Sequence, residues 1–374
     1  MKNNRTFLEK LLDGAEVEWK PLGKVTDIKT GQSVSKNIIA QNLGIYPVIN
    51  SGREPLGFIN EWNTENDPIG ITTRGAGVGS ITWQEGKYFR GNLNYSVTIK
   101  SEYELNVRFL YHILLHFQKE IHNLCSFTGI PALNASELKK LEIPIPPLPV
   151  QTEIVKILDA LTALTSELTS ELILRRKQYE YYREKLLSEE ELEKVGFEWK
   201  PLGEVTNIKT GQAVSKYSIS QNPGIYPVIN SGREPLGFIN EWNTENDPIG
   251  ITTRGAGVGS ITWQEGKYFR GNLNYSVTVK SDYKLNIRFL YHILLHFQKE
   301  IHDLCSFTGI PALNASELKK LEISIPAIEE QQRIVSILDK FEALTNSITE
   351  GLPLAIEQSQ KRYEYYRELL LNFS

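Results

Sequence analysis

Polar and basic residues gather in loops between apolar runs of this 374-residue chain. Arginine can form two hydrogen bonds with the edge of a guanine and asparagine two with an adenine, while lysine, serine and threonine donate to phosphates. These residue types, interleaved with aromatic residues, indicate recognition of nucleic acid rather than catalysis. The candidate contacts come in two matching sets: Ser51, Arg53, Thr73, Arg74, Lys87, Arg90 and Asn94, and Ser231, Arg233, Thr253, Arg254, Lys267, Arg270 and Asn274.

Each of these residues can also be accounted for without a ligand, because an arginine in a loop is more often a solvated charge than a contact. The segment Ser126–Gly129 precedes another turn and is a further polar loop of the same kind. Tyr46, Trp62, Trp83 and Tyr95 are expected in the core rather than stacked on bases. The pattern therefore predicts a recognition surface without assigning any single base contact.

No recognisable catalytic set accompanies these residues, since the sequence has neither a Walker phosphate loop nor an HExxH zinc motif. The glycine run Gly75–Gly79 lacks the following helix and later acidic residue of a dinucleotide site, so tight turns are the better interpretation. His112 and His116 share one helix face with His122 nearby, but a metal site needs more ligands. Cys125 is expected in the core. We expect no catalytic residue, metal or cofactor on this chain.

An internal repeat dominates the sequence. Trp19–Ile143 aligns with Trp199–Ile323 at a constant offset of 180, with 12 differences over 125 positions. Gly44–Thr98 and Gly224–Thr278 are identical. A shared fold does not require identical surface loops, which tolerate drift. Either the duplication is recent or both copies recognise the same target.

Each repeat is predicted to form a compact α/β or α+β domain. Short β-rich runs separated by glycines are followed by a helix over 107–122 and a further helix start at Asn134 or Ser136. The prolines of Ile143–Pro149 exclude a helix there and predict a stiff hinge. The expected strands are Val25–Lys29, Tyr46–Ile49, Ile69–Thr73, Ser80–Trp83 and Tyr95–Lys100.

A long helix follows each domain. In Gln151–Leu187 and Gln331–Leu371 apolar residues recur every three or four positions, which is the spacing of one helix face. At 1.5 Å per residue the first helix is roughly 55 Å long. We expect the two apolar faces to pair as an antiparallel coiled coil; the alternative is that each helix is buried separately on its own domain. Gly351–Pro353 should kink or interrupt the second helix.

The beginning of the chain resembles the end of the first long helix. Leu8–Leu12 and Glu184–Leu187 each precede a WKPLG sequence. The N-terminal segment should therefore dock near the end of the second helix, which gives a circular, pseudo-two-fold arrangement with a domain at either end. The predicted divisions are an N-terminal segment at 1–18, domain 1 at 19–149, helix 1 at 150–190, domain 2 at 191–329 and helix 2 at 330–374.

The overall composition is that of a globular protein, with 40% hydrophobic and 23% charged residues. There is no run of 18 apolar residues that would predict a membrane span, and the first residues lack the apolar core of a signal peptide. Two cysteines without a disulfide framework fit a reducing cytoplasm. With a net charge of -4, DNA binding would depend on local basic patches or on a partner.

These features together resemble the specificity subunit of type I restriction–modification enzymes. The resemblance is carried by the run FTGIPALNASELKKLEIPIPPLPVQTEIVKILD and its second copy, by the WKPLGKVTDIKTG openings, and by the helix endings RKQYEYYREKLL and KRYEYYRELLL. It covers essentially the whole chain. It implies two target recognition domains, each recognising half of a bipartite site in double-stranded DNA, joined by two spacer helices.

The resemblance also implies partners and a division of labour. Adenine methylation, ATP-driven translocation and cleavage would belong to methyltransferase subunits, of which we expect two, and to restriction subunits. S-adenosylmethionine, ATP and magnesium are then expected on those partners, with no cofactor on this chain. The helix faces left free by the pair would dock the methyltransferase subunits, with these candidate contacts: Arg175, Arg176, Tyr179, Tyr182, Tyr363 and Tyr366.

Because the two domains are nearly identical and should face opposite ways, we expect an interrupted palindrome, in which one half-site and its inverted copy flank unspecified bases. The tandem units Thr165–Leu168 and Thr169–Leu172 resemble the family's spacer-length repeats. The alternatives are a free-standing, two-headed DNA-binding regulator, an enzyme with an unrecognised site, and a scaffold for other proteins.

Overall fold

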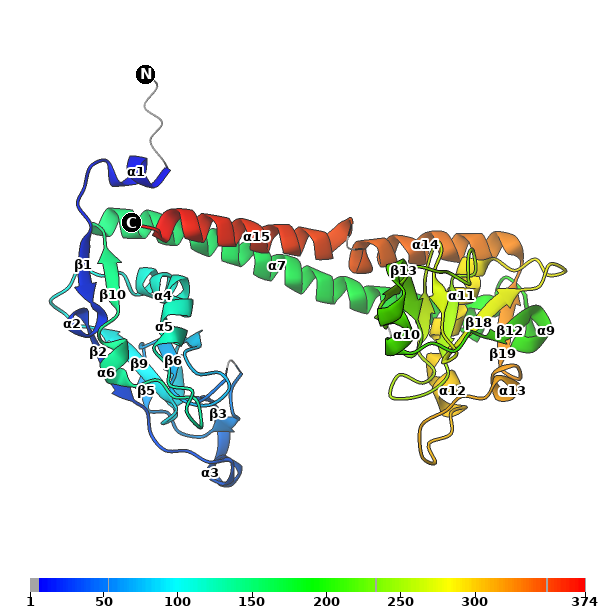
Figure 1. Ribbon diagram of the computed structural model, residues 1–374, viewed down its shortest axis with the longest axis horizontal. Helices are drawn as coiled ribbons and strands as arrows, with labels where there is room; N and C mark the ends of the chain where they lie inside the picture. Colours follow the sequence, from blue (N-terminus) through cyan, green and yellow to red (C-terminus); the bar gives the residue numbers. More distant parts are fainter. Residues whose placement is uncertain (1–6, 53, 233, 348, 374) are drawn as a thin grey trace, which may run out of the picture. The chain divides into compact units, whose positions relative to one another are not determined.

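The structure is a computed structural model that describes residues 7–52, 54–232, 234–347 and 349–373. The chain divides into two compact units: unit 1 contains residues 1–168 and 356–374, and unit 2 contains residues 169–355. Each unit holds one repeat and segments of the long helices (Figure 1). This division cuts across the helices, so the boundaries expected where repeats and helices meet stay predictions.

The first half of the chain contains these elements: α1 (Phe7–Leu12), β1 (Glu18–Pro21), α2 (Leu22–Val25), β2 (Thr26–Thr30), α3 (Lys36–Gln41), β3 (Leu43–Ile49), β4 (Phe58–Ile59), β5 (Thr64–Glu65), β6 (Ile69–Thr72), β7 (Ile81–Trp83), β8 (Lys87–Arg90), β9 (Asn94–Ile99), α4 (Val107–His116), α5 (Gln118–Asn123), α6 (Ala135–Leu138), β10 (Glu142–Ile145) and α7 (Leu148–Leu186).

The second half follows the same order, except that an isolated bridge at Thr244 stands in place of β5 and two helices stand in place of α7. Its elements are α8 (Glu189–Glu193), β11 (Phe197–Pro201), α9 (Leu202–Val205), β12 (Thr206–Thr210), α10 (Lys216–Gln221), β13 (Pro223–Ile229), β14 (Phe238–Ile239), β15 (Ile249–Thr252), β16 (Ile261–Trp263), β17 (Phe269–Arg270), β18 (Asn274–Val279), α11 (Ile287–His296), α12 (Gln298–Asp303), α13 (Ala315–Leu318), β19 (Glu322–Pro326), α14 (Ile328–Asn346) and α15 (Gly351–Leu371).

Two sheets and a two-stranded ribbon build the domain of unit 1. The main sheet is antiparallel with the order β2-β9-β6-β7, and a second sheet, β4-β3-β8-β5, contains the parallel pair β3 and β8. In the ribbon, β1 pairs with β10, so the strand that enters the domain lies beside the strand that leaves it for α7. Unit 2 repeats the main sheet as β12-β18-β15-β16 and the ribbon as β11-β19. The predicted α+β class is confirmed.

The predicted strands correspond to β2, β3, β6, β7 and β9, but two helix expectations need correction. The helix expected over 107–122 is divided into α4 and α5 at Phe117, which has φ -82° and ψ 18° and sets its ring against Trp19. The hinge expected at Ile143–Pro149 is extended only in its first part, because α7 starts at Leu148. Proline is tolerated at Pro149, since N–H groups in a first helical turn have no partner to lose.

The main core of unit 1 joins the sheet to α4 and α4 to the first turns of α7. Ile71 and Val97 of the sheet, Phe109 of α4, and Ile154 and Leu158 of α7 belong to one cluster and have no exposed surface. The spacing of four between the two α7 residues places them on one face of the helix. The domain is therefore seated on the beginning of the helix that follows it.

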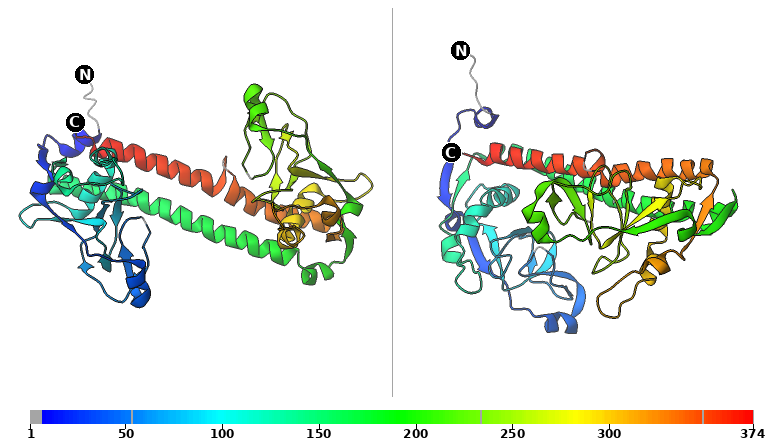
Figure 2. Two further views of the ribbon diagram at one scale, coloured as in Figure 1. Left: turned by 60° about the horizontal axis from the view of Figure 1, so that its bottom comes forward. Right: turned by 45° about the vertical axis from the view of Figure 1, so that its right-hand side comes forward.

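The long helices pair in an antiparallel sense, as predicted. In unit 2, Arg176 of α7 donates to the Thr345 carbonyl of α14 at 3.5 Å, and Tyr182 further along α7 stacks on Phe341 at 5.4 Å between ring centroids. Residue numbers thus rise along one helix as they fall along the other. In unit 1, α7 and α15 also lie side by side (Figures 1 and 2). The alternative of two separately buried helices is wrong.

The interruption expected in the second helix is confirmed. α14 ends at Asn346 and α15 begins at Gly351. Gly351 has φ +79°, and a Cβ at this position would lie 2.6 Å from the carbonyl oxygen of Ala343. Only glycine fits such a close approach in a left-handed conformation. Pro353 then stands in the first turn of α15, where it is tolerated.

The N-terminal helix α1 lies at the end of α15 within unit 1. Leu8 and Leu12 line a hollow with Leu369 and Phe373, and Leu8 is buried. Among the helices of the described ranges, none has both the length and the apolar character that crossing a membrane requires.

A single carboxylate links the domain of unit 1 to α7. Arg108 of α4 donates through Nε to both oxygens of Asp159, at 2.9 and 3.0 Å, and His112 Nε2 lies 2.7 Å from Asp159 Oδ1. His112 is buried, and burial lowers the pKa of its imidazole more than Asp159 raises it. We call Asp159 the junction carboxylate of unit 1.

Asp339 of α14 is the junction carboxylate of unit 2. Arg288 of α11 donates to Asp339 Oδ1 through Nε at 3.0 Å and Nη2 at 2.7 Å, and His292 Nε2 lies 2.8 Å from the same oxygen. Burial would raise the pKa of Asp339, but the hydrogen bonds from His292 and Arg288 outweigh it and hold that pKa below its ordinary value.

Replacing a junction carboxylate should loosen one domain from its helix. Asp159→Asn leaves the Arg108 charge without its partner, so we expect a loss of about 2 kcal/mol in the free energy of unfolding measured by urea titration. The matched control is Glu153→Gln on the same helix, which removes only an exposed ion pair with Lys156 and should change the free energy by less than about 0.5 kcal/mol. Equal effects of the two substitutions would contradict the role of Asp159.

Candidate nucleic-acid interface

Three loops of unit 1 converge beside the main sheet. Between β6 and β7 the chain turns at Gly75, whose N–H donates to the carbonyl of Pro131 in the loop between α5 and α6 at 3.0 Å. Arg74 forms a β-bridge with Ala132 of that same loop. A Cβ on Gly77 would lie 3.2 Å from the carbonyl oxygen of Ser51, which follows β3. We call these three segments, Ser51, 74–80 and 126–132, the loop cluster.

The loop cluster offers a cation beside exposed apolar groups. Arg74 is exposed, and among the described residues no carboxylate forms an ion pair with it. Phe127 is 52% and Ile130 68% exposed, on either side of Gly129, which has φ +86°. Such a set can place a guanidinium against a base edge or a phosphate and an apolar contact against a thymine methyl or a sugar.

Unit 2 builds the same cluster from the second repeat. Gly255 donates to the Pro311 carbonyl at 3.0 Å, and Arg254 bridges Ala312. Arg254, Phe307 and Ile310 are exposed like their counterparts. The two clusters therefore present the same chemistry, which agrees with the identity of the two loop sequences.

The structure does not bring Lys87 to the loop cluster. Lys87 begins β8, whereas Ser51 follows the end of the parallel strand β3, and Val48 pairs with Phe89. At about 3.3 Å per residue this puts Lys87 more than 10 Å along the strands from the cluster. Its ammonium instead lies 4.5 Å from the ring centre of Trp62, as that of Lys267 does from Trp242.

Trp62 was expected in the core, and this expectation is wrong because the indole is exposed beside Lys87. Tyr46, Trp83 and Tyr95 are partly buried. A cation over an exposed indole is a surface that nucleic acid can also use, since bases stack on aromatic faces. We count the Lys87–Trp62 pair as a separate candidate contact.

Arg90 and Asn94 require a correction, because they lie inside the domain. Arg90 is 3% exposed and Asn94 has no exposed surface. Through Nη1 the guanidinium donates to Asn94 Oδ1 at 2.6 Å and to the carbonyls of Ile69 and Tyr95 at 3.1 and 3.0 Å. Nη2 donates to the Asp67 carbonyl at 2.6 Å. Through these hydrogen bonds Arg90 and Asn94 join β6, β8 and β9.

Arg270 and Asn274 repeat this correction in unit 2. Arg270 donates to Asn274 Oδ1 at 2.5 Å, to the Tyr275 carbonyl at 3.0 Å and to the Asp247 carbonyl at 2.6 Å. Burial lowers the pKa of both arginines, and neighbouring tyrosine and aspartate groups oppose that shift. Neither guanidinium has a face left for a base or a phosphate.

The remaining predicted contacts differ in their placement. Thr73 and Thr253 are buried and use their backbones in the fold, since each donates its N–H to a leucine carbonyl at 2.9 Å. Ser51 is exposed and Ser231 half-buried. Arg53 and Arg233 lie outside the described residues.

The helix residues expected to dock a partner also divide into exposed and buried sets. Tyr179 needs correction: it is 8% exposed and its hydroxyl lies 3.3 Å from His292 Nδ1. Burial raises its pKa to about 12. Tyr363 and Tyr366 pack against the core of unit 1. Tyr182 is exposed at one edge although it stacks on Phe341.

Arg175 and Arg176 lie nearer the surface, but neither is free. Arg175 donates to Glu171 at 2.6 Å and to Gln178 at 2.9 Å, and Arg176 reaches the carbonyl of Thr345. Arg176 is nevertheless exposed, and Arg175 is half-buried.

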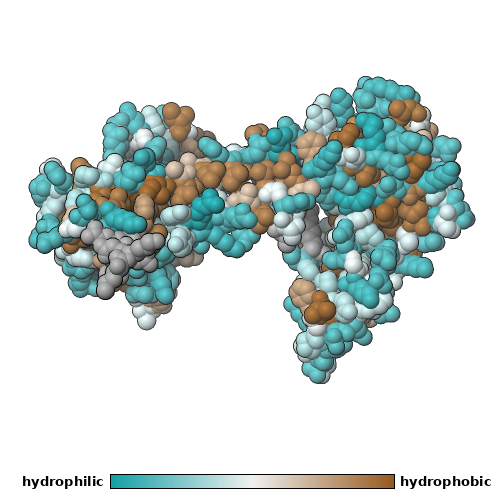
Figure 3. All heavy atoms as spheres, turned by 90° about the horizontal axis from the view of Figure 1, so that it is seen from above, coloured by the Kyte–Doolittle hydropathy of each residue, from teal (hydrophilic) through white to brown (hydrophobic). Residues whose placement is uncertain are grey.

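Sequence reasoning missed Tyr181 and Tyr365, which are more than half exposed. The signal was present, because residues two apart on a helix point about 200° away from each other, so the neighbours of a buried Tyr179 must face outward. Apolar residues also reach the surface along the helices (Figure 3), and Ile173 and Leu174 of α7 are more than half exposed.

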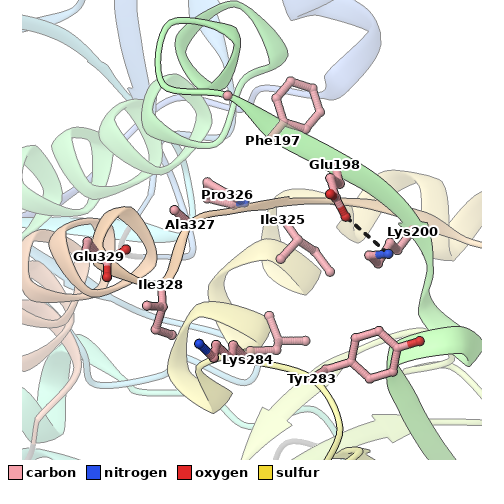
Figure 4. Close-up of a pocket in the computed structure, with 12 residues that line it drawn as sticks. Phe197, Glu198, Lys200, Tyr283, Lys284, Ile325, Pro326, Ala327, Ile328 and Glu329 are labelled. Atoms are coloured by element: carbon pink, nitrogen blue, oxygen red, sulfur yellow. Dashed lines mark ion pairs between the residues drawn. The ribbon is translucent and has the colours of Figure 1, made fainter.

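A hollow in unit 2 is an alternative candidate site (Figure 4). It is lined by apolar side chains of the β11-β19 ribbon and the start of α14, including Phe197, Ile325 and Ile328, and by the ion pair between Lys200 and Glu198 at 3.2 Å. Its lining, as far as the chain is described, has no nucleophile with a neighbouring base. Nothing there favours the enzyme alternative.

One group of side chains has the types and spacing of metal ligands. His292, Asp339 and Glu342 place ligand atoms within 4.8 Å of one another. Arg288, however, donates to both carboxylates at 2.7 and 2.6 Å. A cation bound there would face this guanidinium at close range, so the group fits an ion-pair network better than a metal.

Comparison with known proteins identifies a family. The family model for the type I restriction modification DNA specificity domain matches residues 15–175 and again residues 194–358. A putative type I restriction enzyme specificity subunit of Haemophilus influenzae is 42% identical over 404 residues, covering all of both chains. The type I restriction enzyme EcoR124I/EcoR124II specificity subunit of Escherichia coli is 34% identical, over 98% of this chain and 97% of its own.

Solved structures agree in fold. The S subunit of a type I restriction–modification system from M. genitalium superimposes with a TM-score of 0.69 at 23% identity, covering 97% of this chain and 98% of its own. A chain from a structure of type I restriction–modification complex assembly superimposes with a TM-score of 0.55 at 16% identity, over 95% of this chain and 98% of its own. Both therefore share the fold of this chain.

Because Arg90 is buried and Arg74 is exposed, replacing each by alanine should change the free energy of unfolding by different amounts. Arg90→Ala leaves several carbonyls and Asn94 without a donor, so we expect the free energy of unfolding to fall by about 3 kcal/mol. Arg74→Ala removes an exposed side chain and should change it by less than about 0.5 kcal/mol. Urea titration of both variants checks this. A stable Arg90→Ala variant would mean that the interior network is not needed.

Proposed function

Because this chain belongs to the family of type I restriction–modification DNA specificity subunits, we propose that it selects one bipartite DNA site on behalf of methyltransferase and restriction subunits. The proposal assigns no catalytic residue and no cofactor to this chain. S-adenosylmethionine, ATP and magnesium belong to the partner subunits. The comparisons lend no support to a free-standing regulator.

The observation that carries the proposal is the loop cluster. It combines an exposed arginine that has no ion-pair partner among the described residues, hydroxyl groups and two exposed apolar side chains, on loops braced by a sheet. Backbone hydrogen bonds between the loops fix their course, so Arg74 approaches DNA from a defined position. Preorganised loops on a rigid scaffold are the usual carriers of recognition.

The near-identity of the repeats favours an interrupted palindrome. Arg74, Phe127 and Ile130 have identical counterparts in the second cluster, so both domains recognise the same half-site. Each domain is seated on the beginning of the helix that follows it and near the end of the other helix. Two domains that carry the same exposed groups support two copies of one half-site.

The helices serve as spacers and as the docking surface for two methyltransferase subunits. Their exposed tyrosines and apolar residues, among them Tyr181 and Ile173, supply the kind of surface that protein partners bury. A helix of 39 residues is about 58 Å long. The proposed gap between half-sites is roughly five to eight base pairs at 3.4 Å per step. The assembled complex acts on DNA in the cytoplasm.

A methylation map tests the proposal directly. The chain is co-expressed with its methyltransferase subunit in a host without DNA methylation, and modified adenines are located across the genome. We expect an interrupted palindrome. Arg74→Ala should relax one half-site by about tenfold and make the motif asymmetric, because one good arginine–base contact contributes about 1–3 kcal/mol.

The repeat provides matched controls for this experiment. Arg254→Ala should give the same asymmetric motif on the opposite strand, and the double variant should relax both halves. If Arg74→Ala alone weakened both half-sites equally, each domain would not serve its own half-site. An assembled complex that leaves the genome unmethylated would refute the proposed function.

The spacer role of α7 makes a separate prediction. Deleting Thr169–Leu172 shortens the helix by about 6 Å, which is close to two base pairs. We expect a gap shorter by one or two base pairs and unchanged half-sites in the methylation map. Replacing the same four residues by alanine keeps the length and should keep the gap. Changed half-sites with an unchanged gap would exclude a spacer.

A further inference from the structure

A cavity of about 450 Å³ lies in unit 1, where α4 meets α7 and α15. α4 lies close beneath these helices in Figure 1. Its lining includes Arg108, Tyr111 and His112 of α4, Thr162 of α7, and Tyr363, Glu364 and Arg367 of α15. Thr162 is exposed, so the cavity is open to solvent at this residue.

Unit 2 contains the same junction with one carboxylate more. Glu342 stands where the first repeat has Thr162, at the offset of 180 that relates the two repeats. Its carboxylate accepts from Arg288 Nη2 at 2.6 Å and from the Tyr291 hydroxyl at 3.4 Å. The side chain of Glu342 is largely buried between these two donors.

In unit 1 the arginine of this contact is present, but Thr162 stands in place of the glutamate. The Arg108 guanidinium lies 4.4 Å from the ring centre of Trp83 and 5.0 Å from that of Tyr111. The corresponding distances around Arg288 are 4.3 and 5.0 Å, so both arginines hold the same position. Aromatic faces that hold a guanidinium in place leave its N–H groups available to an acceptor.

The described residues of unit 1 do not replace the Glu342 carboxylate. Arg108 gives its Nε to Asp159, and the described residues present no second carboxylate to its Nη atoms. The Thr162 hydroxyl donates to the Leu158 carbonyl of its own helix at 2.9 Å. His112 Nδ1 is buried and has no partner in the described part of the chain, whereas His292 Nδ1 lies 3.3 Å from the Tyr179 hydroxyl. The junction of unit 1 therefore has more unsatisfied hydrogen-bonding groups than the junction of unit 2.

We propose that this cavity is a binding site for a single carboxylate, which occupies beside Arg108 the position that Glu342 occupies in unit 2. A guanidinium binds a carboxylate through charge-assisted hydrogen bonds. Asp159 and Glu364 are also at the cavity, so a group with two negative charges, such as a phosphate, is disfavoured. The carboxylate is borne by a small free acid or by an acidic side chain of a bound protein.

Propionate is the probe for the site, because it is the side chain of glutamate without its backbone. Its binding to the full chain is measured by saturation-transfer NMR at constant ionic strength, with chloride as the replaced anion. Wild-type protein should give a saturable signal. Thr162→Glu places the carboxylate inside the cavity and should abolish that signal, while Glu342→Thr opens the second junction and should about double it.

The control substitution is Thr152→Glu on the same helix. Thr152 is exposed and its hydroxyl donates to the Leu148 carbonyl at 2.9 Å, so this variant adds the same charge to a similar site away from the cavity. It should bind propionate like the wild type. Equal signals from Thr162→Glu and Thr152→Glu, or no saturable signal from the wild type, would overturn the proposal.

Assembly distinguishes the two sources of the carboxylate, and only this step rests on the proposed function. If an acidic side chain of the methyltransferase subunit enters the cavity, Thr162→Glu should weaken assembly by about tenfold relative to Thr152→Glu. Equal assembly of the two variants, together with the loss of propionate binding, assigns the site to a small free acid.

Discussion

Each domain is joined to its long helix by an arginine that binds carboxylates of that helix, Asp159 in unit 1 and Asp339 with Glu342 in unit 2, and the position of the loop cluster depends on that contact. Asp159 and Asp339 each accept hydrogen bonds from an arginine of the domain and each lie within hydrogen-bond distance of a buried histidine. The same arginine lies over a tryptophan of the strand that leaves the loop cluster, Trp83 in unit 1. One guanidinium thus connects α7, α4 and β7, the strand that follows the loop containing Arg74. A shift of this contact would be transmitted to the loop by packed elements rather than absorbed by a flexible link.

A second buried arginine supports the loops from the other side. Arg90, on β8, reaches the carbonyls of Ile69 on β6 and Tyr95 on β9, and also holds the carbonyl of Asp67. A buried guanidinium is costly unless its donors are satisfied, and here almost all of them are. The domain therefore uses arginine in two ways: Arg90 inside fixes the strands, and Arg74 outside is left available. The exposed arginine has a defined position only because the buried one holds the sheet.

The sequence shows the long helices plainly, because an apolar residue at every third or fourth position over more than thirty residues is typical of a helix. Gly351 marks the break by its backbone freedom. The sequence could not separate Arg90 from Arg74, since both are arginines among aromatic and polar residues, and only contacts with distant residues such as Asp67 and Ile69 show which is buried. Tyr179 was misjudged for a similar reason, since its partner His292 is more than a hundred residues away. The division of the domain helix at Phe117 has no local breaker and follows from packing against Trp19.

If α7 is the proposed spacer, its unbroken course has a consequence for how such a protein can change its target. Four added residues lengthen a helix by about 6 Å and turn its far end by about 40°. Two base pairs of B-form DNA advance by a similar distance but turn by about 70°. Adding one tandem unit to the helix therefore matches the length of two more base pairs. The rotation of the helix end, however, is roughly 30° smaller than the rotation of the DNA. The DNA must untwist or the helices must coil to close that difference, so the spacer sets a rotational phase as well as a length.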